Sequence, residues 1–268
     1  GTLLAIAQGE LLFEHPTAFI MNNALDKTIQ EFKMWGAMSR KPGQPSDYML
    51  SQYRQILIEQ SSVPGGTERY PEVQAERIWE VILKRLMQKD YKFDATMLGS
   101  LNELSRKVAY FFHASLQGTG CYPGAAIALQ HIHKAGLAQG LLADGQCFTT
   151  VQLQRGLNTQ DKDLRLESLL TDGLVVLSHE LRGKKPSERL FRKAVELLQA
   201  NDISPGEVLH VGSRIQQDLI PAKRLGMHTA LFAGDKTSLN ATPEQLKEPA
   251  SRPDVLLTEL EQIVEVVG

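Results

Sequence analysis

Short apolar strands alternate with amphipathic helices over the second half of the chain, and no other feature constrains its fold as strongly. Five segments have the length and apolar composition of strands: residues 137–144, 172–180, 206–212, 228–233 and 253–257. Helical patterns lie between them, most clearly in the helix that Pro123 opens and in residues 186–200. Strands separated by helices of this length predict a parallel sheet that helices cover on both faces.

The earlier part of the chain, residues 15–118, carries helical patterns alone. Residues 71–88 and 101–112 repeat apolar side chains every three or four positions, which is the spacing of a helix that buries one face. We therefore expect a helical unit that is distinct from the α/β unit after it.

The composition excludes several classes of protein. The chain has 268 residues, 42% of them hydrophobic, which is enough for one large domain or two smaller ones. Its net charge of -2 gives no indication of binding to nucleic acid or to a membrane surface. No apolar run approaches the ~20 residues that span a bilayer, and the first residues carry no basic leader. Cys121 and Cys147 lack the spacing of a metal site, so we expect two reduced thiols in a cytoplasmic protein.

Polar residues follow three of the predicted strands. In a parallel α/β sheet, ligands bind at the carboxyl ends of the strands, so these residues are the candidates for a site. Residues 143–145 follow the first strand, residues 178–180 the second and residues 212–213 the third. Lys185 stands directly before Pro186, in the loop that leads to the next helix.

Three segments then carry a resemblance to a known family: YPGAAIALQHIHKAGLAQGLLADG, VVLSHELRGKKPSERLFRKAVELL and VLHVGSRIQQDLIPAKRLGMHTALF. In order and spacing they resemble the haloacid dehalogenase-like (HAD) hydrolases, over roughly residues 120–260. GTLL at residues 1–4 resembles the end of that family's first motif, Asp-x-Asp-Gly-Thr-Leu. The resemblance implies a Rossmann-type parallel-sheet core from residues 1–14 and 119–268, with an all-helical cap, residues 15–118, inserted after the first strand.

The resemblance also implies a chemistry. An aspartate attacks phosphorus, or carbon in the dehalogenases, and forms a covalent aspartyl intermediate. A lysine neutralises developing charge, a Ser or Thr holds a phosphoryl oxygen, and Mg²⁺ held by acids offsets the charge of the phosphate. On this chain the resemblance assigns Lys185 and Thr2 to catalysis, Ala143, Asp144 and Gly145 to substrate binding, and Asp218 and Ser213 to Mg²⁺ binding.

The chain departs from the family's pattern at three places. The two aspartates of the first motif would lie just before Gly1, so we expect the natural protein to begin several residues earlier. Ala143 stands at the Ser/Thr position and offers no hydroxyl to a phosphoryl oxygen. Ser213 stands at the first acid of the last motif, and a neutral hydroxyl is a much weaker Mg²⁺ ligand than a carboxylate.

Some matching residues also have a purely structural interpretation. Asp218 precedes Leu219, Ile220 and Pro221, so it is equally suited to cap a helix. Asp144 precedes a glycine, which is typical of a turn. A lysine at a helix start is electrostatically unfavourable because the helix N-terminus attracts anions, and this favours a functional interpretation of Lys185.

The sequence therefore predicts a Mg²⁺-dependent phosphatase of a small phosphorylated metabolite, with a degraded set of motifs. Two alternatives stay open: a catalytically inactive protein of this fold with a binding or regulatory role, and a metal-independent dehalogenase. A plain nucleotide-binding domain is less well supported, since no Gly-x-Gly-x-x-Gly or Walker-type motif occurs. The identity of the substrate and the oligomeric state are not readable from the sequence.

Overall fold

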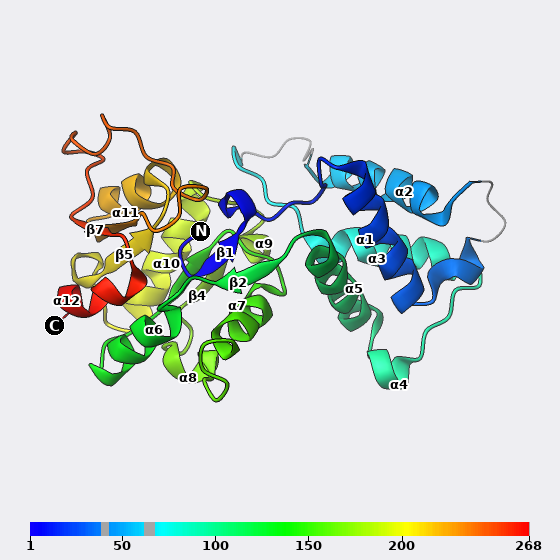
Figure 1. Cartoon of the computed structure of the whole chain (residues 1–268), viewed down its shortest axis with the longest axis horizontal. Helices are drawn as coiled ribbons and strands as arrows, with labels where there is room; N and C mark the ends of the chain where they lie inside the picture. The colour runs from blue at the N-terminus through cyan, green and yellow to red at the C-terminus, as the bar shows by residue number, and fades with distance from the viewer. Residues whose placement is uncertain (39–42, 62–67, 268) are drawn as a thin grey trace.

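The computed structural model describes residues 1–38, 43–61 and 68–267, and it has two lobes (Figure 1). One lobe is helical and the other combines strands and helices, which confirms the predicted fold class of a Rossmann-type core with a helical cap. The division into residues 1–14 with 119–268 and residues 15–118 stays a prediction. Among the described residues, no helix has both the length and the apolarity that a membrane span requires.

The helical lobe is built around three aromatic side chains that are fully buried. The ring centroids of Tyr53 and Phe112 lie 5.0 Å apart, and those of Trp79 and Phe112 lie 5.2 Å apart. Rings at these distances bury large apolar surfaces against each other. The helices of this lobe are α1 (Ala18–Glu31), α2 (Pro45–Ser61), α3 (Ala75–Met87), α4 (Ala95–Leu98) and α5 (Leu101–Leu116).

The α/β lobe contains one strand in each of the five predicted segments. These strands are β3 (Leu141–Ala143), β4 (Val175–Leu177), β5 (Leu209–Gly212), β6 (His228–Phe232) and β7 (Val255–Leu257). The helices of this lobe are α6 (Ala125–Lys134), α7 (Thr149–Asn158), α8 (Leu166–Leu169), α9 (Ser178–Leu181), α10 (Glu188–Ala200), α11 (Ile220–Arg224) and α12 (Ile263–Val267).

The parallel strands form two sheets rather than the single sheet that the alternation predicts. β3 pairs with β4, and β5, β6 and β7 pair in that order, all in parallel. Within the described part of the chain, no ladder joins the two groups. Alternation along the chain makes neighbouring strands parallel but does not say which strands become neighbours, so the lateral order could not be predicted.

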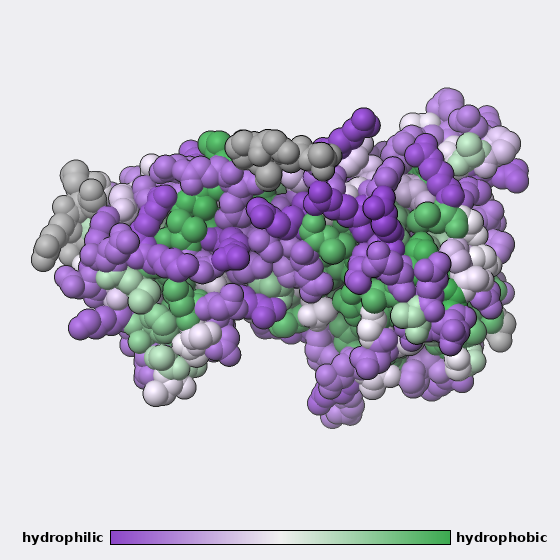
Figure 2. Space-filling view, turned by 180° about the vertical axis from the view of Figure 1, so that it is seen from behind, coloured by the Kyte–Doolittle hydropathy of each residue, from purple (hydrophilic) through white to green (hydrophobic). Residues whose placement is uncertain are grey.

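Two connections join the lobes, and an amide side chain at the start of the second binds to the first. The antiparallel strands β1 (Leu4–Ile6) and β2 (Thr119–Cys121) bring the connections side by side. The Gln117 side chain donates to the carbonyls of Glu10 and Ala7, at 3.0 and 3.3 Å, and accepts from the Leu12 N–H at 3.0 Å. Viewed from behind, most of the surface is hydrophilic, and a notch separates the two lobes (Figure 2).

The helix predicted over residues 71–88 begins only at Ala75, because the residues before it lie against the α/β lobe. Pro71 forms an antiparallel bridge with Gly183, and the Lys184 N–H donates to the Tyr70 carbonyl at 2.8 Å. We call residues 68–75 the strap. Its backbone groups bond to another part of the chain and are therefore not available for helical hydrogen bonds.

We predict that Phe112→Ala destabilises the protein by about 3–5 kcal/mol, because it leaves a cavity in the centre of the aromatic cluster. Phe19→Ala removes the same atoms from a side chain that is 77% exposed and should cost less than about 0.5 kcal/mol. The free energies of unfolding in urea measure both changes. Similar values for the two variants would contradict this account of the cluster.

Candidate functional site

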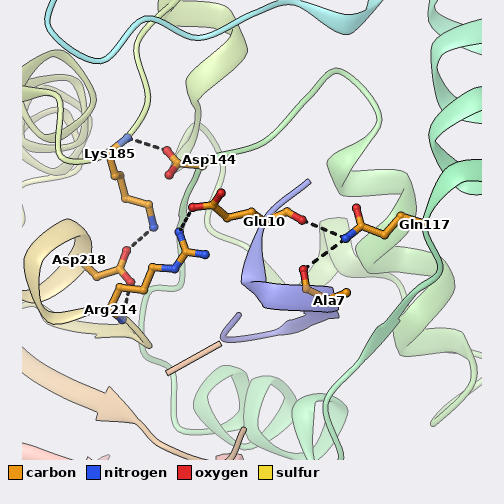
Figure 3. A network of polar contacts seen from close by, with 7 residues as sticks. All are labelled: Ala7, Glu10, Gln117, Asp144, Lys185, Arg214 and Asp218. Atoms are coloured by element: carbon orange, nitrogen blue, oxygen red, sulfur yellow. Dashed lines mark hydrogen bonds and ion pairs between the residues drawn. The ribbon is translucent and has the colours of Figure 1, made fainter. Parts of the chain in front are cut away.

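Lys185 lies at the centre of a polar cluster at the carboxyl ends of three strands. Its ammonium forms an ion pair with Oδ1 of Asp218, which follows β5, and only 14% of its side chain is exposed. Its backbone N–H donates to Oδ1 of Asp144, which follows β3, at 2.7 Å. Lys185 itself comes from the loop after β4, so this residue connects the ends of strands from both parallel sheets (Figure 3).

Asp218 is held from two sides. Its Oδ2 accepts from the Arg214 N–H at 3.0 Å, and its side chain is only 4% exposed. Gly212 permits this arrangement, because a Cβ atom at that position would lie 2.4 Å from the Asp218 Cβ. Asp218 stands inside the helical turn Ile215–Leu219, so the interpretation as a helix N-cap was wrong. In place of a cap, its carboxylate closes the loop behind it and binds Lys185.

The three central groups influence one another electrostatically. Burial opposes charge on Asp218, but the Lys185 ammonium, the charge of His210 and the hydrogen bonds from Lys185 and Arg214 together outweigh it, so the pKa of Asp218 lies below its ordinary value. Burial also opposes charge on Lys185, yet the Asp218 and Asp144 carboxylates raise its pKa. The pKa of Asp144 is raised because its burial outweighs the attraction of Lys185. The cluster therefore keeps Lys185 protonated in a place where water is scarce.

The segment Ala143–Gly145 is fixed by Ser178, a strand-end residue to which the resemblance assigned no role. The Gly145 N–H donates to Oγ of Ser178 at 2.9 Å, so this N–H is already used and does not point freely to a ligand. Ala143 ends β3 and contributes only a methyl group. Of the three residues assigned to substrate binding, Asp144 is the one whose side chain reaches Lys185.

Ser213 and the first residues of the chain lie close together at the end of β5. Ser213 is buried, and a Cβ atom on Gly1 would lie 2.7 Å from its hydroxyl oxygen. Thr2 follows directly, so the segment that resembles the end of the first motif lies beside the segment that resembles the last. This places all seven predicted site residues at the same end of the parallel strands.

The donor atoms present do not fit a Mg²⁺ ion as they are arranged. Both oxygens of Asp218 accept hydrogen bonds, from Lys185 and from Arg214, and Ser213 offers an uncharged hydroxyl. Mg²⁺ demands an octahedron of oxygen ligands, usually with one or two free carboxylates. In the ranges that the structure describes, no three His, Cys, Asp or Glu side chains are grouped as metal ligands.

Further polar residues extend the site beyond those that the sequence indicated. Arg214 forms an ion pair with Glu10 at 2.8 Å, and Asp235 accepts from the Tyr122 hydroxyl at 2.6 Å. Hydrogen bonds, led by that of Tyr122, hold the pKa of Asp235 well below its ordinary value. Asp235 comes shortly after β6, so it could have been identified from the expectation that ligands bind at the carboxyl ends of parallel strands. Glu10 and Tyr122 lie in the connections between the lobes and carry no comparable signal.

A polar cavity of about 300 Å³ lies beside Arg214. Its polar lining consists of Glu10, Arg214, Gln217, Thr237, Ser238 and Asn240. The side chains offer both donors and acceptors, with one carboxylate and one guanidinium, which suits a small hydroxylated or amide-bearing group better than a bare ion.

Parts of the chain are similar in sequence to known proteins. A sequence model of the family described as HAD-hydrolase-like matches residues 183–263. The chain is 34% identical over 148 residues to a glyceraldehyde 3-phosphate phosphatase of Pyrococcus furiosus, covering 54% of the chain and 53% of the relative. It is 34% identical over 76 residues to the rhythmically expressed gene 2 protein of Drosophila melanogaster, covering 26% of the chain and 29% of the relative. The chain thus spans about half the length of the first relative and less of the second.

One solved structure resembles almost the whole chain. It is a 2-haloacid dehalogenase from Pseudomonas syringae pv. tomato, with a TM-score of 0.52 and 16% sequence identity, and the match covers 94% of this chain and 92% of that one. At this identity the likeness concerns the fold.

We predict that Asp218→Asn destabilises the protein by about 3–5 kcal/mol, because it leaves the Lys185 ammonium buried without its ion-pair partner. Adding Lys185→Met to this variant removes the stranded charge and should recover most of the loss. Urea unfolding at pH 7, followed by circular dichroism, measures both. A loss below about 1 kcal/mol in the single variant would show that the pair is not buried as described.

Proposed function

We propose that the chain is a haloacid dehalogenase-like (HAD) hydrolase and that it hydrolyses phosphate esters of a small metabolite. The observation that carries the proposal is the buried Lys185 ammonium at the carboxyl ends of β3, β4 and β5. A protonated lysine in a poorly hydrated place attracts a phosphate group strongly, because little solvent screens the interaction. The naming of two Pyrococcus relatives as glyceraldehyde 3-phosphate phosphatases supports a small phosphorylated substrate.

The proposed reaction follows the family's scheme. A carboxylate of the first motif attacks phosphorus, the alcohol leaves with a proton, and water then hydrolyses the acyl phosphate. Lys185 is shared between Asp218 and a phosphoryl oxygen, so it offsets the negative charge that gathers during attack. Asp144 holds the Lys185 backbone, and Thr2 orders the phosphate from the other side.

Mg²⁺ has a smaller role in the proposed reaction than it has in the family. In the family, the ion offsets charge on the phosphate and the nucleophile, and Asp218 and Ser213 are the positions that would hold it here. Because Asp218 is already bound to Lys185 and Arg214, we infer that hydrolysis depends little on added Mg²⁺. Lys185 would then supply most of the positive charge at the site.

A second candidate function is binding without turnover. Three observations favour it: Ala143 lacks a hydroxyl, Ser213 lacks a charge, and the Gly145 N–H is used by Ser178. A protein with these features retains the attraction of Lys185 for a phosphorylated ligand while losing groups that position the phosphoryl oxygens. Since a fold does not fix a function, the two candidates are separated by experiment.

We predict that Lys185→Ala lowers kcat/KM for a phosphate monoester by about 10²-fold or more, because the charge on the phosphoryl group is no longer offset. The matched control is Lys184→Ala, which removes an exposed neighbouring lysine and should stay within about twofold of the wild type. Release of inorganic phosphate from a panel of small monoesters, with the full gene product, measures both. Equal losses in the two variants would contradict the role of Lys185, and a silent wild type that still binds phosphate monoesters would favour the second candidate.

We predict that the double variant Ala143→Ser/Ser213→Asp gains Mg²⁺-dependent hydrolysis, by about tenfold or more over the wild type at saturating Mg²⁺. The change restores a hydroxyl and a carboxylate at the positions where the family carries them. The variant Ala143→Ser/Ser213→Asn brings a similar shape without the charge and serves as the control. An equal response of both variants to Mg²⁺ and to a chelator would contradict the metal role of position 213.

A further inference from the structure

A carboxyl group from the strap reaches into the α/β lobe and contacts a fully buried serine. Oε2 of Glu72 lies 2.6 Å from Oγ of Ser178. The same Oγ accepts from the Gly145 N–H at 2.9 Å and lies 3.1 Å from the Gly145 carbonyl. Three polar atoms from two distant segments therefore converge on one hydroxyl.

The number of hydrogens around this hydroxyl identifies the form of Glu72 that fits it. A serine hydroxyl has one hydrogen to donate and accepts two. If the Glu72 carboxyl is neutral, it donates to Ser178, and Ser178 donates to the Gly145 carbonyl, so every contact has its hydrogen. If the carboxyl is ionised, the Ser178 hydrogen turns to Glu72, and the Gly145 carbonyl keeps the His179 N–H, at 3.2 Å, as its donor. The neutral form is therefore the one in which every contact of the Ser178 hydroxyl has a hydrogen.

We propose that Glu72 is a positioning residue: through Ser178 it fixes the Ala143–Gly145 segment, and through Asp144 it fixes Lys185, while the strap lies on the α/β lobe. The proposal rests on the proposed function for the role of Lys185. It goes beyond that function by making the geometry of the site depend on a residue of the helical part of the chain. Glu72 does not itself touch the position of a phosphoryl group.

The strap is bound on both sides of Glu72, so it delivers the carboxyl at a defined place. The Lys184 N–H donates to the Tyr70 carbonyl at 2.8 Å, next to Lys185 in the chain. The buried Gln146 side chain, next to Gly145, accepts from the Ala75 N–H at 2.9 Å and donates to the Val73 carbonyl at 2.8 Å. Release of the strap would therefore free both loops that hold Lys185.

The charges around Glu72 make this contact sensitive to pH. Burial raises the pKa of Glu72 to about 7; the charge of Asp144 adds to the shift, while Lys184 and the Val73 N–H oppose it. Arg182 faces the strap through its backbone carbonyl, which accepts from the Glu72 N–H at 3.3 Å. A raised carboxyl pKa means that docking of the strap is most favourable below the ordinary value of 4.5 and is weakened as the pH rises through about 7.

The test is amide hydrogen exchange of the full protein without substrate, so it requires no turnover. We expect Glu72→Ala to speed exchange in peptides that cover residues 143–147 and 183–187 by about tenfold or more. Glu72→Gln retains a donor to Ser178 and should keep the slow exchange. After correction for intrinsic rates, the exchange of this variant should be the same at pH 6 and pH 8, whereas that of the wild type should be faster at pH 8. The matched control is Glu68→Gln, another strap carboxyl, which accepts from the Ser187 hydroxyl at 2.7 Å and should leave residues 143–147 unchanged.

The outcomes separate this proposal from the proposed function. Unchanged exchange in Glu72→Ala, or an equal effect of Glu68→Gln on residues 143–147, would overturn the positioning role whether or not the protein is active. If Glu72→Ala does not fold, Ser178→Ala removes the same connection and must give the same local increase. If the wild type shows the coupled, pH-dependent exchange but hydrolyses no phosphate ester, the positioning role stands and the phosphatase proposal fails. In an active protein, Glu72→Ala should lower kcat by about tenfold with little change in KM.

Discussion

One buried ion pair, between the Lys185 ammonium and the Asp218 carboxylate, holds together strand ends that belong to different sheets. Removing two charges from water costs several kcal/mol per ion, so such a pair adds little net stability compared with an apolar pair of the same size. The pair acts mainly on geometry, because moving the two strand ends apart would leave each charge buried without its partner. Two further hydrogen bonds strengthen this constraint. The Lys185 N–H donates to the Asp144 carboxylate, and the Arg214 N–H donates to the Asp218 carboxylate.

Sequence periodicity predicted the elements of the fold, but contacts between distant residues could not be predicted from it. The five parallel strands β3 to β7 lie in the predicted segments, because short apolar runs between helices have few other solutions. The division into two sheets was missed, since lateral strand order leaves no periodic signal. The start of α3 at Ala75 was missed for a related reason: residues 71–74 belong to the predicted helical segment, but Pro71 is bonded to a loop more than 100 residues away.

At the candidate site, too, residues that follow the local sequence pattern were predicted, and residues brought in by long-range contacts were not. Asp144 was identified because it follows a strand, and Lys185 because it matches the family's lysine before a proline; the structure brings the two together. Glu10 contacts Arg214 and Glu72 contacts Ser178 at the cluster, yet each comes from a segment whose partner lies far along the chain. Positive charge at this site comes from Lys185 and Arg214, while the position that carries an acid in the family holds Ser213. A lysine carries a single point charge at the end of a flexible side chain. The position of that charge therefore depends on the residues that contact the side chain.

Gln117 has a consequence for how this architecture can change over evolution. Its one side chain bonds to Ala7, Glu10 and Leu12, so the chain leaves the α/β lobe and returns to it within the reach of a single amide (Figure 3). An insertion whose two ends are already adjacent places almost no demand on the length or shape of what lies between them. As long as the strap is kept, the rest of the helical lobe can therefore be enlarged or shortened without pulling the surrounding strands apart, and new substrate ranges can arise while the charged centre stays as it is.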